Sequence, residues 1–171
     1  MKKITLALFS LAITFTLQAQ ANLAVQVIDA SAVPQAVLDA QASHYPSVAV
    51  RQWKKQTLSG PSRGQEQYLA SFTESDGNTR VRYTSAGKAL VAYTTLKPEA
   101  ISSTVKSSLN TAYPGHKILH VGKSTSLVNG KMAYRAILRK GGQKLTVWLN
   151  ASGTIIDPDN LPEDVVEEGN V

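Results

Sequence analysis

The chain has 171 residues, of which 43% are hydrophobic, and its basic residues exceed its acidic ones by six. It contains no cysteine, which excludes disulfide bonds, so apolar packing alone must hold the fold. After the leader described next, no apolar run approaches the roughly 20 residues of a membrane-spanning helix, which excludes an integral membrane protein of helical type.

The first 21 residues have the pattern of a secretory signal peptide. Lys2 and Lys3 form a positively charged start, and residues 4–17 form an apolar segment too short to span a bilayer. Ala19 and Ala21 supply the small residues that precede a cleavage site. We therefore expect a signal peptide at 1–21, cut after Ala21, and a mature product that is periplasmic or secreted.

The charges of the mature chain are unevenly distributed. The last 15 residues hold six of its 12 acidic residues and no basic one, so residues 22–156 carry a net charge of +10. A body this basic favours acidic partners, although it also serves plain solubility. The acidic tail, residues 157–171, is expected to be flexible, or to fold back and screen part of this charge.

An amphipathic helix is predicted to begin near Val33. Before it, residues 23–30 are a short apolar lead-in that fits either a strand or a first helical turn. Val33, Val37 and Ala40 recur at spacings of four and three, which places them on one helical face. Pro46 disfavours helical geometry at the residue before it and therefore ends the helix.

Four strands are predicted after this helix. Gly-containing or Asn-containing segments at residues 75–78 and 85–88 have the chemistry of hairpin turns. Within the second strand, period-two alternation places Tyr68, Ala70 and Phe72 on one face. The predicted strands are residues 48–53, 66–73, 79–84 and 89–94.

The same order of elements recurs in the second half of the chain. The apolar stripe of its helix is formed by Ile101, Val105, Leu109 and Ala112. A Gly-Gly pair at residues 141–142 supplies a hairpin turn. The predicted strands are residues 117–123, 131–140, 143–150 and 154–156.

The two halves align with one another. Residues 33–55 match 101–123 at an offset of 68, with Tyr45-Pro46 over Tyr113-Pro114. The predicted fold class is therefore α+β, with two tandem repeats of a helix plus a four-stranded antiparallel β-meander and both helices packed on one face of a curved sheet. The repeats are assigned to residues 31–95 and 96–156, and whether they share one continuous sheet is left open.

At these residues the chain resembles the exported PepSY-like proteins, also described as β-lactamase-inhibitor-like. The motifs that carry the resemblance cover residues 31–156; where that family usually has an aromatic residue in the helix, this chain has Gln41. The resemblance implies a helix packed on a curved sheet and a binding or inhibitory role outside the cytoplasm. The motifs are Val-Pro-x-Ala-Val at 33–37, the two Tyr-Pro pairs, Trp53-Lys54, the aromatic strand 68–72 and Ala86-Gly87-Lys88.

No constellation of residues predicts catalysis or a cofactor. His116 and His120 are four residues apart in a predicted strand, which separates them by about 13 Å, too far for one metal ion. His44 and His116 adjoin the two Tyr-Pro pairs, and a metal or pH role for them is the less favoured interpretation. We expect a protein that is not an enzyme, with no metal site and no cofactor.

The sheet face away from the helices is the predicted binding surface. Its residues mix arginine with large apolar side chains, a composition typical of recognition patches. We predict binding of a protein or peptide partner, with enzyme inhibition as one form of this role. The alternatives are adhesion to an anionic polymer such as polysaccharide, DNA or lipid, a homodimer interface, and an ordinary solvent face. The predicted binding residues are Leu69, Arg80, Arg82, Arg135, Ile137, Arg139 and Trp148.

Overall fold

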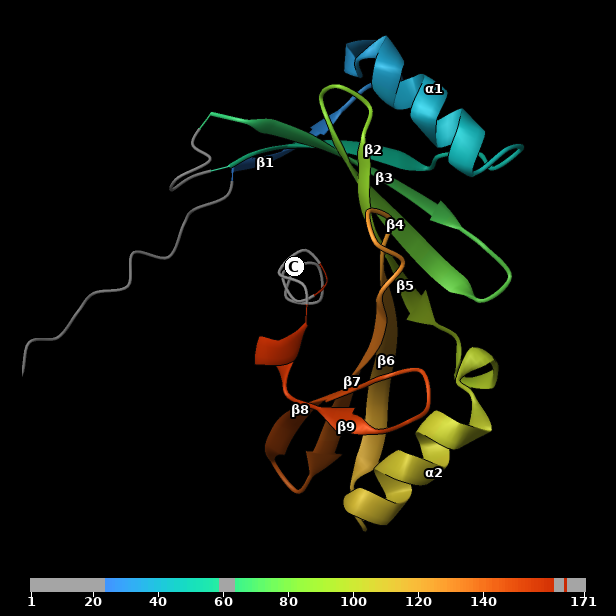
Figure 1. Cartoon of the computed structure of the whole chain (residues 1–171), viewed down its shortest axis with the longest axis vertical. Helices are drawn as coiled ribbons and strands as arrows, with labels where there is room; N and C mark the ends of the chain where they lie inside the picture. Colours follow the sequence, from blue (N-terminus) through green and yellow to red (C-terminus); the bar gives the residue numbers. More distant parts are fainter. Residues whose placement is uncertain (1–23, 59–63, 162–164, 166–171) are drawn as a thin grey trace, which may run out of the picture.

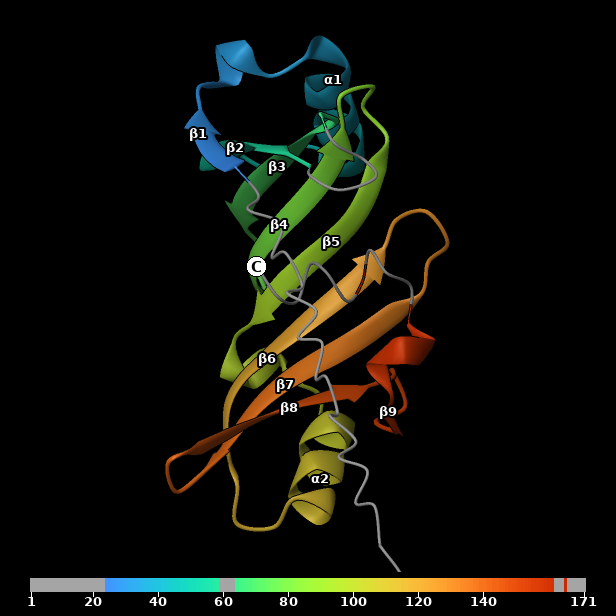
Figure 2. The same ribbon diagram turned by 90° about the vertical axis from the view of Figure 1, so that its left-hand side faces the viewer.

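The computed structural model describes residues 24–58, 64–161 and 165. Within them, nine antiparallel strands form one continuous sheet whose spatial order follows the chain order from β1 to β9 (Figure 1, Figure 2). The strands are β1 Ala24–Ile28, β2 Gln52–Thr57, β3 Glu66–Thr73, β4 Gly77–Thr84, β5 Ala89–Leu96, β6 Lys117–Ser126, β7 Met132–Lys140, β8 Gln143–Leu149 and β9 Ile155–Ile156.

The helices α1 Gln35–His44 and α2 Ser103–Ala112 accompany the sheet, and both lie on its right-hand side in Figure 1. Each helix ends directly before a Tyr-Pro pair, as predicted. Short 3₁₀ segments in the described part of the chain lie at the connections: η1 Ala30–Ala32, η3 Pro98–Ala100 and η4 Pro158–Asn160.

The predicted fold class of two tandem helix-plus-four-strand repeats is wrong. The last strand of the expected first unit, β5, pairs with β6, the first strand of the expected second unit, so a single sheet runs through both. The apolar lead-in adds a further strand, β1, paired with β2. The physical reason is that an isolated meander would expose the unpaired backbone groups of its edge strand, and the β5–β6 pairing satisfies them. The assigned boundary between residues 95 and 96 falls at the end of β5 and stays a prediction.

Each helix covers its own part of the sheet with a separate apolar cluster. Val37 of α1 is buried among residues of β2 to β5, and Val105 and Leu109 of α2 are buried among residues of β5 to β8. The prediction that Tyr68, Ala70 and the residues in register with them face the helices is confirmed. The buried sheet residues of the two clusters are Trp53, Tyr68, Ala70, Phe72, Val81, Tyr83, Ala89, Ala92, Leu96, Val121, Ala136, Leu138, Val147 and Leu149.

One buried polar contact lies within the first cluster. The hydroxyl of Tyr83 donates a hydrogen bond to the Gln41 side-chain oxygen of α1 at 2.7 Å, and both residues are buried. Gln41 thus occupies an interior position, where it connects the helix to the C-terminal end of β4.

Some predicted segments lie outside the described residues. These are the signal peptide at 1–21 and, except for residue 165, the acidic tail after residue 161. Of the helices in the described part of the chain, neither is long and apolar enough to cross a membrane.

Candidate binding site

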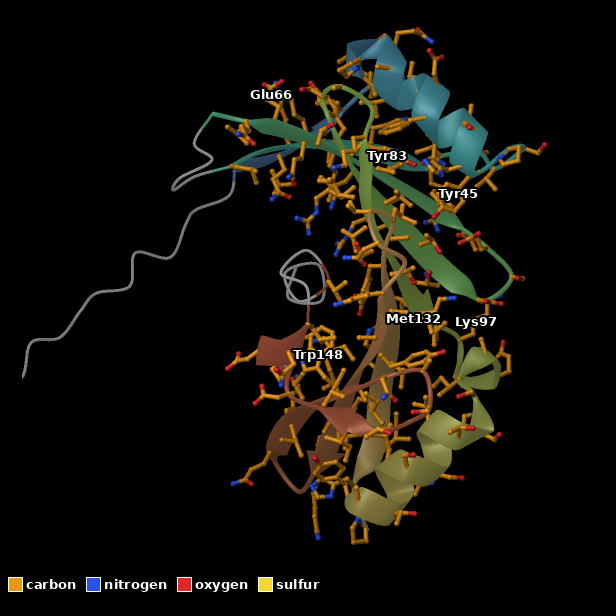
Figure 3. All side chains as sticks on the ribbon, in the orientation of Figure 1. Tyr45, Glu66, Tyr83, Lys97, Met132 and Trp148 are labelled. Atoms are coloured by element: carbon orange, nitrogen blue, oxygen red, sulfur yellow. The ribbon has the colours of Figure 1, made fainter. Side chains whose placement is uncertain are left out.

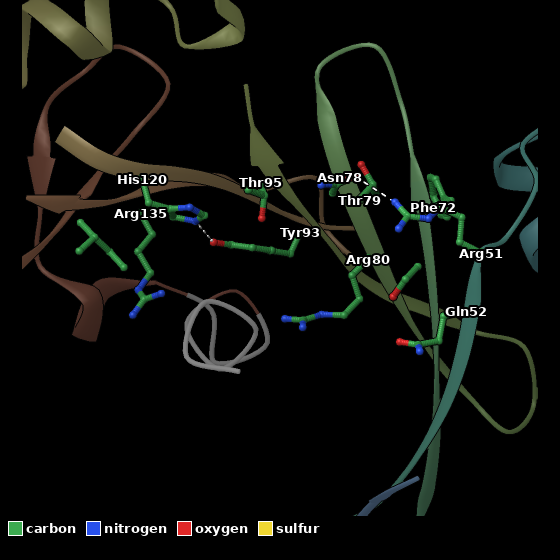
Figure 4. Close-up of a pocket in the computed structure, with 12 residues that line it drawn as sticks. Arg51, Gln52, Phe72, Asn78, Thr79, Arg80, Tyr93, Thr95, His120 and Arg135 are labelled. Atoms are coloured by element: carbon green, nitrogen blue, oxygen red, sulfur yellow. Dashed lines mark hydrogen bonds between the residues drawn. The ribbon is translucent and has the colours of Figure 1, made fainter. Parts of the chain in front are cut away.

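A cavity of about 600 Å³ opens on the sheet face away from the helices (Figure 4). Alternation along the strands places its two central arginines there, because Arg80 and Arg135 each precede a residue of the helix-facing clusters. Residues from the start of β2 to β7 line the cavity, namely Arg51, Gln52, Ser71, Phe72, Asn78, Thr79, Arg80, Tyr93, Thr95, His120, Arg135 and Ile137.

The centre of the cavity wall is a contact between β5 and β6. The Tyr93 hydroxyl and the His120 Nε2 are 2.9 Å apart and hydrogen-bonded, and the two rings are stacked (Figure 4). Gly122 leaves the space that the Tyr93 ring occupies, because a Cβ at this position would overlap the ring. The Arg80 guanidinium lies 5.7 Å from the centre of the same ring, within range of a cation–π interaction.

The cavity is strongly basic. Three arginines line it, and none of its lining residues in the described part of the chain is Asp or Glu. The Nε of Arg135 is buried and has no hydrogen-bond partner among the described residues. A buried donor without a partner is costly, so this group favours a ligand that can accept a hydrogen bond.

The local environment shifts the pKa values of the central pair. Burial, and secondly the positive charge of Arg135, lower the pKa of His120 below its ordinary value of 6.5. Burial raises the pKa of Tyr93, and the neighbouring arginines oppose this rise. Around neutral pH the pair is therefore uncharged, and the positive charge of the site comes from its arginines.

The far side of the cavity is held by a polar cluster. The Nη1 of Arg51 donates hydrogen bonds to the Thr73 Oγ1 at 3.0 Å and to the Asn78 Oδ1 at 3.5 Å. These contacts fix the guanidinium at the start of β2, next to the β3–β4 hairpin. Arg51, at the start of β2, thus lines the same cavity as Arg80 of β4 and Arg135 of β7.

The structure separates the seven predicted binding residues into three groups. Arg80, Arg135 and Ile137 line the cavity together. Arg139 is exposed near the end of β7, outside the cavity. The remaining three are buried, with exposed fractions of 2% for Leu69, 4% for Arg82 and 6% for Trp148.

The buried residues belong to a set of buried positions, which we call the buried stripe, on the face away from the helices. Pairing makes Leu69, Arg82 and Val91 direct neighbours across β3, β4 and β5. Across β6 and β7, Ser124 pairs with Ala133 in the same way. Figure 3 shows Trp148 on the side of the sheet opposite α2. The buried stripe consists of Leu69, Arg82, Val91, Ser124, Ser126, Ala133 and Trp148, each at most 6% exposed.

At its β8 end the buried stripe is covered by the chain's own C-terminal part. Val165 is fully buried in one cluster with Ala133 and Trp148, and Ile156 and Leu161 pack against this cluster. Trp148 is therefore occupied within the chain instead of standing open as an anchor for a partner.

The cavity residues that sequence reasoning missed include Arg51, Tyr93 and His120. Alternation from the helix-facing Ala92 would have placed Tyr93 on the open face. The adjacency of Tyr93 and His120 depends on the β5–β6 pairing, and no sequence signal indicated that the two strands are neighbours. Arg51 lies inside the predicted strand 48–53, whereas in the structure it directly precedes β2, so alternation along the predicted strand did not indicate the cavity.

The other histidines lie apart from this site. His116 packs edge-on against Tyr113 and His44 adjoins Tyr45, both beside the Tyr-Pro pairs. A register shift between Ile118 and His120 interrupts the alternation of β6. In the described ranges, no group of three or more His, Cys, Asp or Glu side chains is placed to hold a metal ion.

Comparisons with known proteins identify the fold. No protein-family model matches the sequence, and no curated protein matches it. A solved structure of a presumed periplasmic protein from Bacteroides eggerthii is similar, with a TM-score of 0.58 and 16% identity over 73% of this chain and 86% of that one. A DUF2874 family protein from Bacteroides uniformis has a TM-score of 0.58 and 17% identity, over 72% of this chain and 86% of that one. A DUF2874 family protein from Bacteroides ovatus has a TM-score of 0.57 and 14% identity, over 76% of this chain and 91% of that one. At these identities the likeness extends to the fold alone.

Proposed function

We propose that this chain is an exported, non-enzymatic binding module that recognises a protein or peptide partner through an acidic group placed in the arginine cavity. The observation that carries the proposal is the convergence of Arg51, Arg80 and Arg135 on one cavity whose described lining contains no acidic residue. Inhibition of an enzyme is one form that such binding takes, in keeping with the PepSY-like resemblance.

Arginine favours a carboxylate as the recognised group. Its planar guanidinium donates two parallel hydrogen bonds to the two oxygens of a carboxylate, and such charge-assisted bonds are stronger than neutral ones. The unpartnered Nε of Arg135 supplies a donor for this purpose. The Tyr93 hydroxyl and the apolar Ile137 add a polar and an apolar wall.

The size of the cavity supports recognition of a chain segment. Its volume of about 600 Å³ falls in the roughly 300–1,000 Å³ range of ligand pockets. Such a cavity accommodates one or two side chains or a chain end. The partner would therefore present an acidic segment, and the surrounding sheet would contribute the rest of the contact.

Two observations support a location outside the cytoplasm. The first 21 residues have the charge and apolar pattern of a signal peptide. The similar protein from Bacteroides eggerthii is described as presumed periplasmic. An exported binding module agrees with both.

The test is capture of partners from the envelope and culture supernatant by the tagged mature chain, residues 22–171. We expect Arg135→Gln to weaken the affinity for a captured protein at least tenfold, because the carboxylate loses a charged donor. Arg139→Gln is the matched control, since it removes the same charge from an exposed position of the same strand outside the cavity. An equal loss of affinity in both variants, or an unchanged affinity in both, would contradict the assignment of binding to the cavity.

The second candidate function is adhesion to an anionic polymer of the envelope or matrix. It is favoured by the charge of +10 over residues 22–156. Polymer binding releases counterions and therefore weakens steeply with salt, and it depends on the number of charges more than on one cavity. Under this alternative Arg139→Gln and Arg135→Gln would weaken binding alike, and a wash at high salt would remove the bound material.

A further inference from the structure

The inference here rests on the proposed function and concerns the regulation of the same site. We propose that the ligand of the arginine cavity in the free protein is the chain's own acidic C-terminal segment, residues 162–171, which an acidic partner must displace.

The buried stripe indicates that this face is covered. Its seven residues come from β3 to β8 and point away from α1 and α2, so neither helix excludes solvent from them. Leu69, Val91 and Arg82 are nevertheless at most 4% exposed. In the proposed arrangement, the C-terminal segment lies over this face and contributes to their burial.

Val165 identifies the part of the chain that reaches this face. It is fully buried against Trp148 and Ala133. Trp148 is the cross-strand partner of Arg135, and Ala133 precedes Arg135 by two residues on the same face of β7. The tail is thus anchored beside an arginine of the cavity.

The remaining length of the tail is sufficient to reach the cavity. The six residues after Val165 span at most about 20 Å when extended, at roughly 3.3 Å per residue. Crossing from β8 to β4 requires four strand spacings, or about 19 Å. The segment can therefore extend from its anchor over the positions of Arg135 and Arg80.

Charge complementarity favours this occupant. Residues 162–171 contain four acidic side chains, Glu163, Asp164, Glu167 and Glu168, and no basic one. The cavity presents three arginines, and none of its described lining residues is acidic. Tethering to the same chain also raises the effective concentration of the segment to the order of millimolar. A partner must then bind tightly enough to outcompete it.

The test uses the full mature chain with a spin label at residue 170. The chain contains no cysteine, so Asn170→Cys provides a single attachment point. Paramagnetic broadening of the NMR signals of Arg135 and Tyr93 is measured in this chain and in a matched variant with Glu163→Gln, Asp164→Asn, Glu167→Gln and Glu168→Gln. We expect strong broadening with the native tail and at least a threefold smaller effect with the neutral tail.

Absence of broadening at the cavity with the native tail would overturn the proposal. Equal broadening with both tails would also overturn it, because the tail would then be held by the apolar contact of Val165 alone. This readout requires no partner, so it stays informative if the proposed function fails.

Partner capture then tests the competition. We expect the chain with the neutral tail to bind a captured acidic partner at least tenfold more tightly than the native chain. An unchanged affinity would overturn the competition. If instead Arg135→Gln leaves capture intact while the broadening is present, the proposed function fails and the occupancy of the cavity by the tail stands.

Discussion

At the scale of single residues, the contact between Gln41 and Tyr83 shows how a polar residue is accommodated in the first apolar cluster. The Gln41 oxygen accepts the Tyr83 hydroxyl hydrogen bond, while the Gln41 Nε2 is buried and has no hydrogen-bond partner among the residues that the structure describes. The pair therefore combines one satisfied contact with one unsatisfied donor. Burial also raises the pKa of Tyr83, so the hydroxyl stays protonated and remains the donor.

A double-mutant cycle would measure this contact. We expect Tyr83→Phe to lower the free energy of unfolding by about 1–2 kcal/mol, because it leaves a buried acceptor unpaired. Gln41→Leu should also destabilise, by leaving the Tyr83 hydroxyl without a partner. The double variant should be more stable than the sum of the single effects predicts, because both polar groups are then gone. Urea unfolding monitored by circular dichroism gives the four values, and simple additivity would show that the two groups are not coupled.

His120 gives the site a dependence on pH. Its pKa is lowered in the folded state by burial and by Arg135, so the unfolded chain takes up the proton first as the pH falls. The stability contributed by the neutral form is complete above the unfolded pKa near 6.5 and is lost as the pH falls from there through the lower folded pKa. We expect the stability advantage of the native chain over His120→Gln to shrink between pH 7.5 and 5. Urea unfolding at several pH values measures it, and an advantage that grows on acidification would contradict this sign.

At the scale of elements, the turn between β4 and β5 contacts α1 through a glycine. Gly87 has φ +81°, and a Cβ there would collide with the backbone carbonyl of Ala36 in α1. A Cβ at Gly153, in the turn between β8 and β9, would likewise collide with Ser108 and Thr104 of α2. Each helix is thus positioned by a hairpin turn as well as by its apolar stripe.

The substitution Gly87→Ala tests this role, with Gly130→Ala as the matched control. Both glycines have positive φ, but a Cβ at Gly130 meets nothing within 4 Å. The control should lose only the roughly 1–2 kcal/mol of left-handed strain. Gly87→Ala should lose about 1–3 kcal/mol more, because the helix must move. Thermal unfolding compares the two, and equal losses would argue against a close turn-to-helix contact.

At the scale of the whole molecule, the continuous sheet predicts that both ends unfold together. Val37 and Val105 are fully buried in the separate clusters under α1 and α2. We expect Val37→Ala to cost about 2 kcal/mol and to shift the unfolding of both ends equally, since β5–β6 pairing joins them. The two tryptophans report on different ends, Trp53 in the first cluster and Trp148 beside Val165. Trp148→Phe and Trp53→Phe backgrounds isolate each signal, and a shift seen by Trp53 alone would indicate independent units.

The limits of prediction from sequence follow from the range of the interactions. Helix ends, hairpin turns and helix-facing residues were predictable, because they depend on local chemistry such as Pro46 and on alternation along one strand. The joining of β5 to β6 was not, because edge pairing depends on backbone groups that every residue carries. Alternation placed Arg80 and Arg135 on one face. Their convergence with Arg51 on one cavity was not predictable, because it depends on how distant strands pair. The burial of Trp148 was missed because it depends on a contact with the distant Val165.

The strict agreement between strand order in space and along the chain has a consequence for how this protein would fold after export. Each strand pairs with the one before it, so no strand must wait for a distant segment before forming its hydrogen bonds. Chains rich in such local pairings have short loops to close and fold faster than those with distant pairings. For a polypeptide emerging from a membrane with its N-terminus first, the sheet can grow one hairpin at a time from β1. The acidic residues after position 156 follow β1 to β9 in the chain, so the strands that carry the cavity arginines emerge before these acidic residues do.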